Sequence, residues 1–517
     1  MAIIVCPQPL ATEIGLEVLK KGGNAVDAAV TTAFVQGVLD PQMCGIGGGG
    51  SMIVHSPTSG DALLEFYPTA GSKAREDQWE RIFIREAADR YGYVLEGCVN
   101  DVGYQSVATP GTVAGLHEAL TRFGTISWEQ AIAPAIPVAR EGFPVSGSMH
   151  GTWTIDYGPD VVHGADRIQT TPAAKALYTH DGALYAIGER FVQTDYAHTL
   201  ERLAVEGPDV FYRGEIANAI AADFEANGGH ITKEDLAAYK VNVTEPIRGS
   251  YRGLSIAAAG PPGGGLTLLQ MLNFLEGYDL GRHGWPSTEC ARLLVEAMAW
   301  AVADRELHVA DPRFVEVPTG ALADKKYAAK AREVVAATAL HDRPDTTHVC
   351  VVDDAGNAVS MTHTLGSSSG VVTPGLGFGY NDYMNCFDPR PGRPNSVRPG
   401  KTRVTMMTPT LVFDGNRLRV AIGAPGGTKI VMGILQTLVN IIDHRMSPFE
   451  AVSAPRIDYQ GDVVQIEGRV PEVVSRGLQK AGYKVSRRTL NYDPYFSKPQ
   501  VIACEKDGFL HGASDPR

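Results

Sequence analysis

Apolar residues recur at helical spacing through the first part of the chain. In residues 11–21, Ile14 and Val18 are four positions apart and can share one face, which predicts a helix that ends at Gly22-Gly23. The alanine-rich segment from Asn24 predicts a second, closely packed helix. Residues 112–345 predict mostly helices with short connections, for example over 128–141, 214–227, 266–276 and 287–310.

The pattern changes after residue 345. Residues 347–352 are β-branched and apolar, residues 353–357 have turn composition, and residues 358–365 form a second apolar run, which together predict a β-hairpin. Further strands are predicted over 409–413 and 418–422, followed by a helix over about 428–443. Before the hairpin, residues 320–345 are polar and rich in Ala and Lys, and they predict an exposed linker.

A run of glycines lies between a predicted helix and a predicted strand, from Cys44 through Gly50. Glycine-rich phosphate loops follow a strand and open a helix, and the order here is the reverse. Phosphate binding is therefore the weaker interpretation. Close backbone packing near a buried centre is favoured, because only glycine allows backbones to approach so closely.

Composition and charge exclude several classes of protein. The 517 residues carry 46 Lys and Arg against 58 Asp and Glu, a net charge of −12, which argues against a nucleic-acid or anionic-membrane partner. No apolar stretch is long enough for a membrane span. The seven cysteines are widely spaced without a CxxC pair, which predicts reduced thiols and a cytoplasmic location.

The candidate chemistry is concentrated at Asp345-Thr346-Thr347-His348, where the linker meets the first strand of the hairpin. Cleavage of the Asp345–Thr346 bond would give Thr346 a free α-amine with a pKa near 8, able to act as the base for its own hydroxyl. The alternative is that two threonines at a strand start reflect β-propensity alone. His341, His348 and His363 have no metal-ligand spacing, so neither a metal nor another cofactor is expected.

Several segments, taken in order, resemble the γ-glutamyltransferase family of N-terminal-nucleophile hydrolases. The shared segments run nearly from end to end: residues 21–29, 44–50, 109–115, 211–214, 228–236, 269–273, 346–348, 353–359, 424–427 and 512–517. The resemblance implies an α+β fold, a four-layer αββα sandwich, built from an autocleaved precursor. The large chain would be residues 1–345 and the small chain residues 346–517, together forming one structural unit. A homodimer of such units would be compatible with the resemblance.

The resemblance also implies roles for individual residues. Thr346 would be the nucleophile and, through its amine, the base, and Thr364 on the paired strand would hydrogen-bond near it. Gly426 and Gly427 would provide backbone N–H groups as an oxyanion hole.

Four family contacts to a γ-glutamyl group are changed in this chain. The arginine for the α-carboxylate corresponds to Tyr67, an asparagine to Gly366, and the acidic residue for the α-amine to Cys386. A pair of serines corresponds to Thr405 and Met406. Each charged contact of this kind is typically worth a few kcal/mol, about 1.5–3 per hydrogen bond.

These changes favour a small acyl amide other than an ordinary γ-glutamyl amide as the substrate. Asp382, Arg398, Lys401 and Arg403 are candidates to replace the lost contacts, although for each of them a solvated surface charge is the favoured alternative. Tyr383 adds to a less polar pocket. Branches of the family act on oxamate-like amides or acylated β-lactam nuclei. The alternatives are a genuine glutathione hydrolase or γ-glutamyltransferase with a rearranged pocket, and a non-catalytic relative that keeps the fold.

Overall fold

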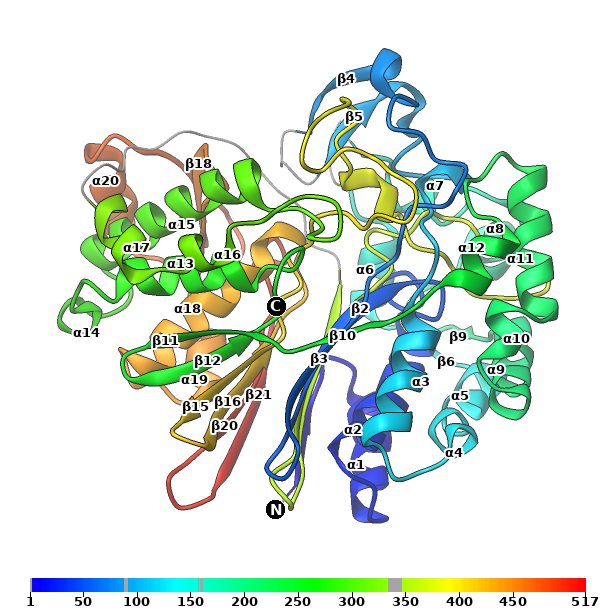
Figure 1. Ribbon diagram of the computed structural model, residues 1–517, viewed down its shortest axis with the longest axis horizontal. Helices are drawn as coiled ribbons and strands as arrows, with labels where there is room; N and C mark the ends of the chain where they lie inside the picture. Colours follow the sequence, from blue (N-terminus) through cyan, green and yellow to red (C-terminus); the bar gives the residue numbers. More distant parts are fainter. Residues whose placement is uncertain (1, 88–91, 157, 159–160, 333–345) are drawn as a thin grey trace.

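The computed structural model describes residues 2–87, 92–156, 158, 161–332 and 346–517. Two six-stranded sheets dominate it (Figure 1). The first sheet has the order β1 (Ile3–Val5), β13 (Thr347–Val352), β14 (Ala358–Thr364), β2 (Gly49–Ser56), β3 (Gly60–Phe66) and β10 (Asn242–Thr244). The second has the order β11 (Ile247–Tyr251), β12 (Leu254–Ala258), β15 (Thr410–Asp414), β16 (Arg417–Gly423), β20 (Gln500–Cys504) and β21 (Leu510–Ser514). The α+β prediction is confirmed.

The inner faces of the two sheets pack against each other. One apolar cluster joins them, with Ile53 and Cys350 from the first sheet and Leu411, Ala421 and Ile502 from the second. A polar contact crosses the same space, because the Ser360 hydroxyl on β14 donates to the Ile422 carbonyl on β16 at 2.9 Å.

Helices cover the outer faces (Figure 1). On the first sheet lie α1 (Pro9–Lys20) and α2 (Ala25–Leu39), with α3 (Thr112–Phe123), α5 (Ala135–Glu141) and α9 (Thr194–Glu206) around them. On the second sheet lie α13 (Gly265–Leu275), α15 (Thr288–His308), α18 (Ile430–Ile442) and α20 (Glu472–Lys480). None of the helices in the described residues is both long enough and apolar enough to cross a membrane.

The helix α2 is buried over nearly its whole length, and its many alanines allow this close packing. Its first turn is tied to the predicted hairpin. Asp353, between β13 and β14, accepts hydrogen bonds from the backbone N–H of Ala25 at 3.0 Å and from three N–H groups of its own turn. Asp353 therefore joins the turn of the hairpin to the first turn of α2.

The part of the predicted exposed linker that the structure describes is helical and has many exposed positions. It contains α16 (Thr319–Leu322) and α17 (Lys325–Ala331), which bury Leu322 and Ala328 and pack near α13. Residues 333–345, including Asp345, lie outside the described residues. The expectation of mostly helices over 112–345 missed β11 and β12, which complete one edge of the second sheet.

Candidate active site

Thr346 stands immediately before β13 and is 8% exposed. In the pairing of β13 with β14, Thr347 lies opposite His363, so one further step in this register places Thr346 opposite Thr364. The Thr364 hydroxyl donates to the Met43 carbonyl at 3.2 Å and accepts from the Gly366 backbone N–H at 2.8 Å. The hairpin thus brings the two threonines together.

The glycines predicted for the oxyanion hole lie in a tight loop after β16. Gly426 has φ +141° and Gly427 has φ +57°, and Gly427 begins the turn that leads into α18. A Cβ on Gly426 would come within 2.9 Å of the Ser497 Cβ. Gly426 lines one cavity together with Thr346. The positive end of the α18 dipole lies on this side, which suits a developing negative charge.

The run of glycines before and in β2 packs against the same hairpin. A Cβ on Gly48 would come within 2.2 Å of the Thr364 carbonyl oxygen, and a Cβ on Gly50 within 2.3 Å of the Thr362 carbonyl oxygen. These contacts agree with the interpretation of close backbone packing beside a buried centre.

The two histidines of the hairpin are buried and neutral. Burial lowers the pKa of both His348 and His363 to about 3. His348 Nδ1 lies 2.8 Å from the Thr362 hydroxyl, and His363 Nε2 lies 3.0 Å from Gln36 Oε1. Within the described ranges, no group of three or more His, Cys, Asp or Glu side chains is placed to hold a metal ion.

Several positions predicted to contact the acyl group lie in a less polar region. Tyr67 and Tyr383 belong to one buried apolar cluster with Met384 and Met407. Burial raises the pKa of the Tyr383 hydroxyl to about 12. Thr405 and Met406 are also buried, and Arg305 donates to the Met406 sulfur at 3.3 Å.

Two of the charged candidates for this region are held by the protein itself. Arg403 lies 4.1 Å from the centre of the Tyr383 ring and donates to the Val404 carbonyl at 3.0 Å. Asp382 is fully buried, accepts the Ser367 backbone N–H at 3.2 Å, and lies 3.6 Å from an Arg167 nitrogen. The prediction that Asp382 replaces a lost substrate contact does not fit this burial, because its carboxylate holds the loop after Thr364.

Gly366 and Asp382 are a matched pair. Gly366 has φ +73°, and a Cβ there would lie 1.9 Å from Asp382 Oδ1. An asparagine therefore cannot occupy this position while Asp382 keeps its place. Cys386 is half-buried beyond this loop, and its carbonyl oxygen accepts from Asn395 Nδ2 at 2.6 Å.

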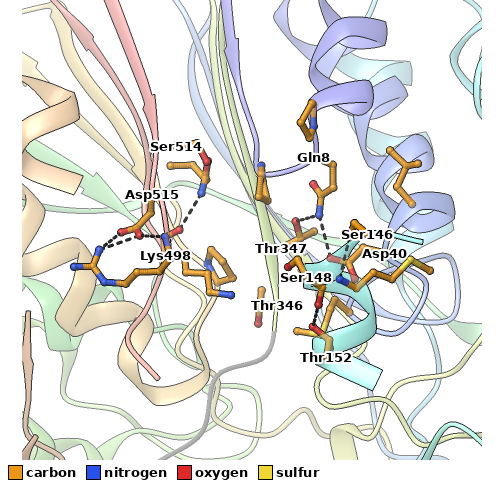
Figure 2. Close-up of a pocket in the computed structure, with 18 of the residues that line it drawn as sticks. Gln8, Asp40, Ser146, Ser148, Thr152, Thr346, Thr347, Lys498, Ser514 and Asp515 are labelled. Carbon is orange, nitrogen blue, oxygen red and sulfur yellow. Dashed lines mark hydrogen bonds and ion pairs between the residues drawn. The ribbon is translucent and has the colours of Figure 1, made fainter. Parts of the chain in front are cut away.

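The structure adds residues that no sequence motif indicated. Arg167 is fully buried, donates to Asp101 Oδ2 at 2.6 Å and to the Ser368 carbonyl at 2.6 Å, and so supports the loop from a helix 201 residues earlier. Gln8, Asp40 and Lys498 line the cavity beside Thr346 (Figure 2). Only long-range pairing brings them there, so local patterns could not have found them.

The comparisons with known proteins decide the family. The family model described as gamma-glutamyltranspeptidase matches residues 11–517. The chain belongs to this family. This gamma-glutamyltranspeptidase family member is 39% identical to the acylase ACY 1 proenzyme of Pseudomonas sp. (strain V22), over 99% of this chain and 91% of that protein. It is 34% identical to the glutathione hydrolase proenzyme of Escherichia coli (strain K12), over 98% of this chain and 89% of that protein.

Solved structures agree with this family assignment. A cephalosporin acylase from Bacillus halodurans superposes with a TM-score of 0.89 at 28% identity, covering 100% of this chain and 94% of that one. Like its relatives, the family member is therefore an N-terminal-nucleophile hydrolase with homology to both acylase and glutathione hydrolase proenzymes.

Proposed function

We propose that this protein is a self-processing amide hydrolase with Thr346 as its N-terminal nucleophile. The observation that carries the proposal is the position of Thr346, which lies opposite Thr364 by strand register and shares a cavity with Gly426. The two facing sheets with outer helices support the αββα arrangement of such enzymes. Cleavage before Thr346 would give chains of 345 and 172 residues, since 517 − 345 = 172.

The proposed reaction needs no group beyond this chain and water. The Thr346 amine takes the hydroxyl proton, and Oγ bonds to the amide carbon. The oxyanion accepts hydrogen bonds from the Gly426 and Gly427 N–H groups, where loss of one donor costs about 3–4 kcal/mol of barrier. The resulting ammonium protonates the leaving nitrogen as the C–N bond breaks. Water then gives a proton to the same amine and bonds to the acyl carbon, and the ammonium returns that proton to Oγ as the Oγ–C bond breaks, which releases the acid and restores Thr346.

Intact mass tests the nucleophile. Wild-type protein should resolve into two chains whose smaller member begins at Thr346, Thr346→Ser should cleave more slowly, and Thr346→Ala should stay whole. Two chains from the alanine variant would remove Thr346 from this role. An uncleaved wild type without amidase activity would favour the non-catalytic relative.

We further propose that the acyl group is not an ordinary γ-glutamyl group. The apolar cluster around Tyr67 and Tyr383, the Gly366–Asp382 contact and the thiol at Cys386 together leave few groups for an α-amine and an α-carboxylate. The 39% identity to a proenzyme named an acylase supports an acyl group other than γ-glutamyl.

A matched series of p-nitroanilides tests the acyl group. γ-Glutamyl, glutaryl and pentanoyl p-nitroanilides differ by the α-amine and then by the carboxylate. We expect glutaryl or pentanoyl p-nitroanilide to exceed the γ-glutamyl compound in kcat/KM by at least about tenfold, since each lost charged contact is worth about 1.5–3 kcal/mol. A preference for the γ-glutamyl compound would instead support a glutathione hydrolase with a rearranged pocket.

A further inference from the structure

A cavity of about 600 Å³ opens beside Thr346, and its lining includes Gln8, from the segment after β1, and Ser514, from β21 (Figure 2). Thr346 and Gly426, the proposed nucleophile and oxyanion-hole residue, both line it. Much of the remaining wall is apolar, with contributions from Leu10, Leu39, Met43, Phe143, Met149 and Phe496. Its volume is sufficient for a small organic molecule.

This cavity is distinct from the acyl side of the site. Its described lining includes none of the positions predicted for the acyl group, most of which gather around Tyr67, Tyr383 and the loop after Thr364. An amide carbon held at Thr346 carries an acyl chain in one direction and a nitrogen substituent in the other. If the acyl chain occupies the first region, the nitrogen substituent points toward the cavity.

Lys498 supplies a positive charge to the cavity wall. Its backbone N–H donates to the Pro425 carbonyl at 3.1 Å, and the neighbouring Ser497 hydroxyl donates to the same carbonyl at 2.8 Å. These two bonds fix the lysine next to the oxyanion-hole loop. The side chain is half-buried, and among the described residues its ammonium has no hydrogen-bond or ion-pair partner.

The other charged groups of the cavity are engaged with protein partners. Asp515 accepts from Arg456 at 2.7 Å and from Arg517 at 2.8 Å. Asp40 accepts from Gln8 Nε2 at 3.1 Å, and in the view of Figure 2 it lies on the opposite side of Thr346 from Lys498. Lys498 is therefore the cation most able to meet an incoming anion.

We infer that this cavity binds the leaving amine, that the amine carries a carboxylate on an apolar body, and that Lys498 pairs with that carboxylate. The inference rests on the proposed function, because it assigns the second half of the same substrate. Two sources share this chemistry, a β-lactam nucleus and a dipeptide. The experiment below separates them.

Binding of free amines to the autocleaved protein tests the inference without turnover. The probes are 7-aminocephalosporanic acid and its methyl ester, and glycylleucine and its amide, each measured by calorimetry or saturation-transfer NMR. For at least one pair, we expect wild-type protein to bind the acid about 5–10-fold more tightly than its neutral partner, as for a half-exposed ion pair worth about 1 kcal/mol. The pair that shows this ratio identifies the source.

The variants make the test specific to Lys498. Lys498→Met should bring the acid-to-neutral ratio close to one, Lys498→Arg should restore most of it, and Lys506→Met, an exposed lysine nearby in sequence, should leave it unchanged. Equal binding of acid and neutral probes to wild type, or an unchanged ratio in Lys498→Met, would overturn the inference.

The proposed function is followed separately through hydrolysis of the p-nitroanilides, whose leaving amine has no carboxylate. Lys506→Met, whose lysine is exposed and does not line the cavity, should hydrolyse the best of these substrates at a rate within about twofold of wild type. Intact anilide hydrolysis without carboxylate-selective binding would overturn the inference alone. Selective binding without any amide hydrolysis would overturn the proposed function alone.

Discussion

Gly366 has a backbone conformation that favours glycine and a space that only glycine fits. Its φ is +73°, and the Asp382 carboxylate stands where a Cβ would lie. Gly375 has a similar φ of +78° with open space around it. A comparison of the same substitution at Gly366 and at Gly375 therefore separates the cost of backbone strain from the cost of steric conflict.

We expect Gly366→Ala to lose about 3 kcal/mol of stability and Gly375→Ala about 1 kcal/mol, because both incur the strain and only the first meets a buried carboxylate. Thermal melts of both variants measure the difference. Gly366→Asn should likewise destabilise the protein rather than improve γ-glutamyl turnover. Equal melting temperatures for the two alanine variants would show that Asp382 moves away at little cost.

Glu65 lies on β3, two residues before Tyr67, and the protonation of its carboxyl group makes the stability of the protein depend on pH. Burial raises the pKa of its carboxyl to about 7, and nearby Asp311 adds to this, although the hydrogen bond from Asn242 at 2.6 Å opposes it. The folded protein therefore binds more protons here than the unfolded chain between about pH 4.5 and pH 7. Its contribution to stability is complete below about pH 4.5 and is lost as the pH rises through about 7.

Glu65→Gln removes this titration and keeps an oxygen for Asn242. Its melting temperature should be close to wild type at about pH 5 and above wild type at about pH 8, because burial destabilises the charged carboxylate by on the order of 1–3 kcal/mol. Glu245→Gln, at an exposed position, should show no such divergence. A constant difference between Glu65→Gln and wild type at both pH values would contradict the raised pKa.

At the scale of elements, the β13–β14 hairpin carries both threonines of the site and depends on α2 for its position. The link is Asp353, whose carboxylate joins the hairpin turn to the first turn of α2. Asp353→Ala leaves several N–H groups without this acceptor and should cost about 3 kcal/mol. The rate of self-cleavage should fall with it.

Asp414, exposed at the turn between β15 and β16, provides the matched control. Its 3.6 Å ion pair with Arg417 is solvated, so Asp414→Ala should change stability by no more than about 0.5 kcal/mol. Melting temperature and the time course of cleavage are read on both variants. Similar losses in the two would mean that the Asp353 network is not what holds the hairpin.

At the scale of the whole molecule, both large sheets combine strands from before and after residue 346. The first takes β13 and β14 from the later part, and the second takes β11 and β12 from the earlier part. After cleavage, the two chains should therefore co-elute in native size-exclusion chromatography and separate only in denaturant. Residues 346–517 expressed alone should not fold. Recovery of a folded fragment from that segment would argue for two independent domains.

Local sequence patterns were sufficient to predict some of the secondary-structure elements. The hairpin around residues 353–357 and the helix over 430–442 follow from short apolar runs and turn residues, and both are present. The strands β11 and β12 pair with each other across a short turn at Arg252 and Gly253, and they were missed because their sequences, IRGSY and LSIAA, contain no continuous β-branched run. What local sequence could not show is their place in the sheet. Ile256 lies opposite Val412, and the two are 412 − 256 = 156 residues apart.

Some residues of the candidate site could likewise be predicted from local sequence, and others could not. Thr346, Thr364 and Gly426 belong to short segments with a recognisable pattern, whereas Arg167 and Lys498 reach the site only through the fold. A sequence pattern also cannot show that a charged side chain is already satisfied. Asp382 is the example, since its buried partners are visible only in three dimensions.

The glycines at 47–50 carry a consequence for mutational tolerance. At each of the four, a single added methyl group would come within 2.3 Å of another atom, and at three of them that atom is a backbone carbonyl oxygen. Because backbone atoms cannot rotate aside as a side chain can, the structure cannot accommodate a substitution at these positions at a low cost in free energy. In a saturation library selected for folded protein, these four positions should be depleted as strongly as the nucleophile is in a library selected for activity. The segment least free to vary would then be one that performs no chemistry.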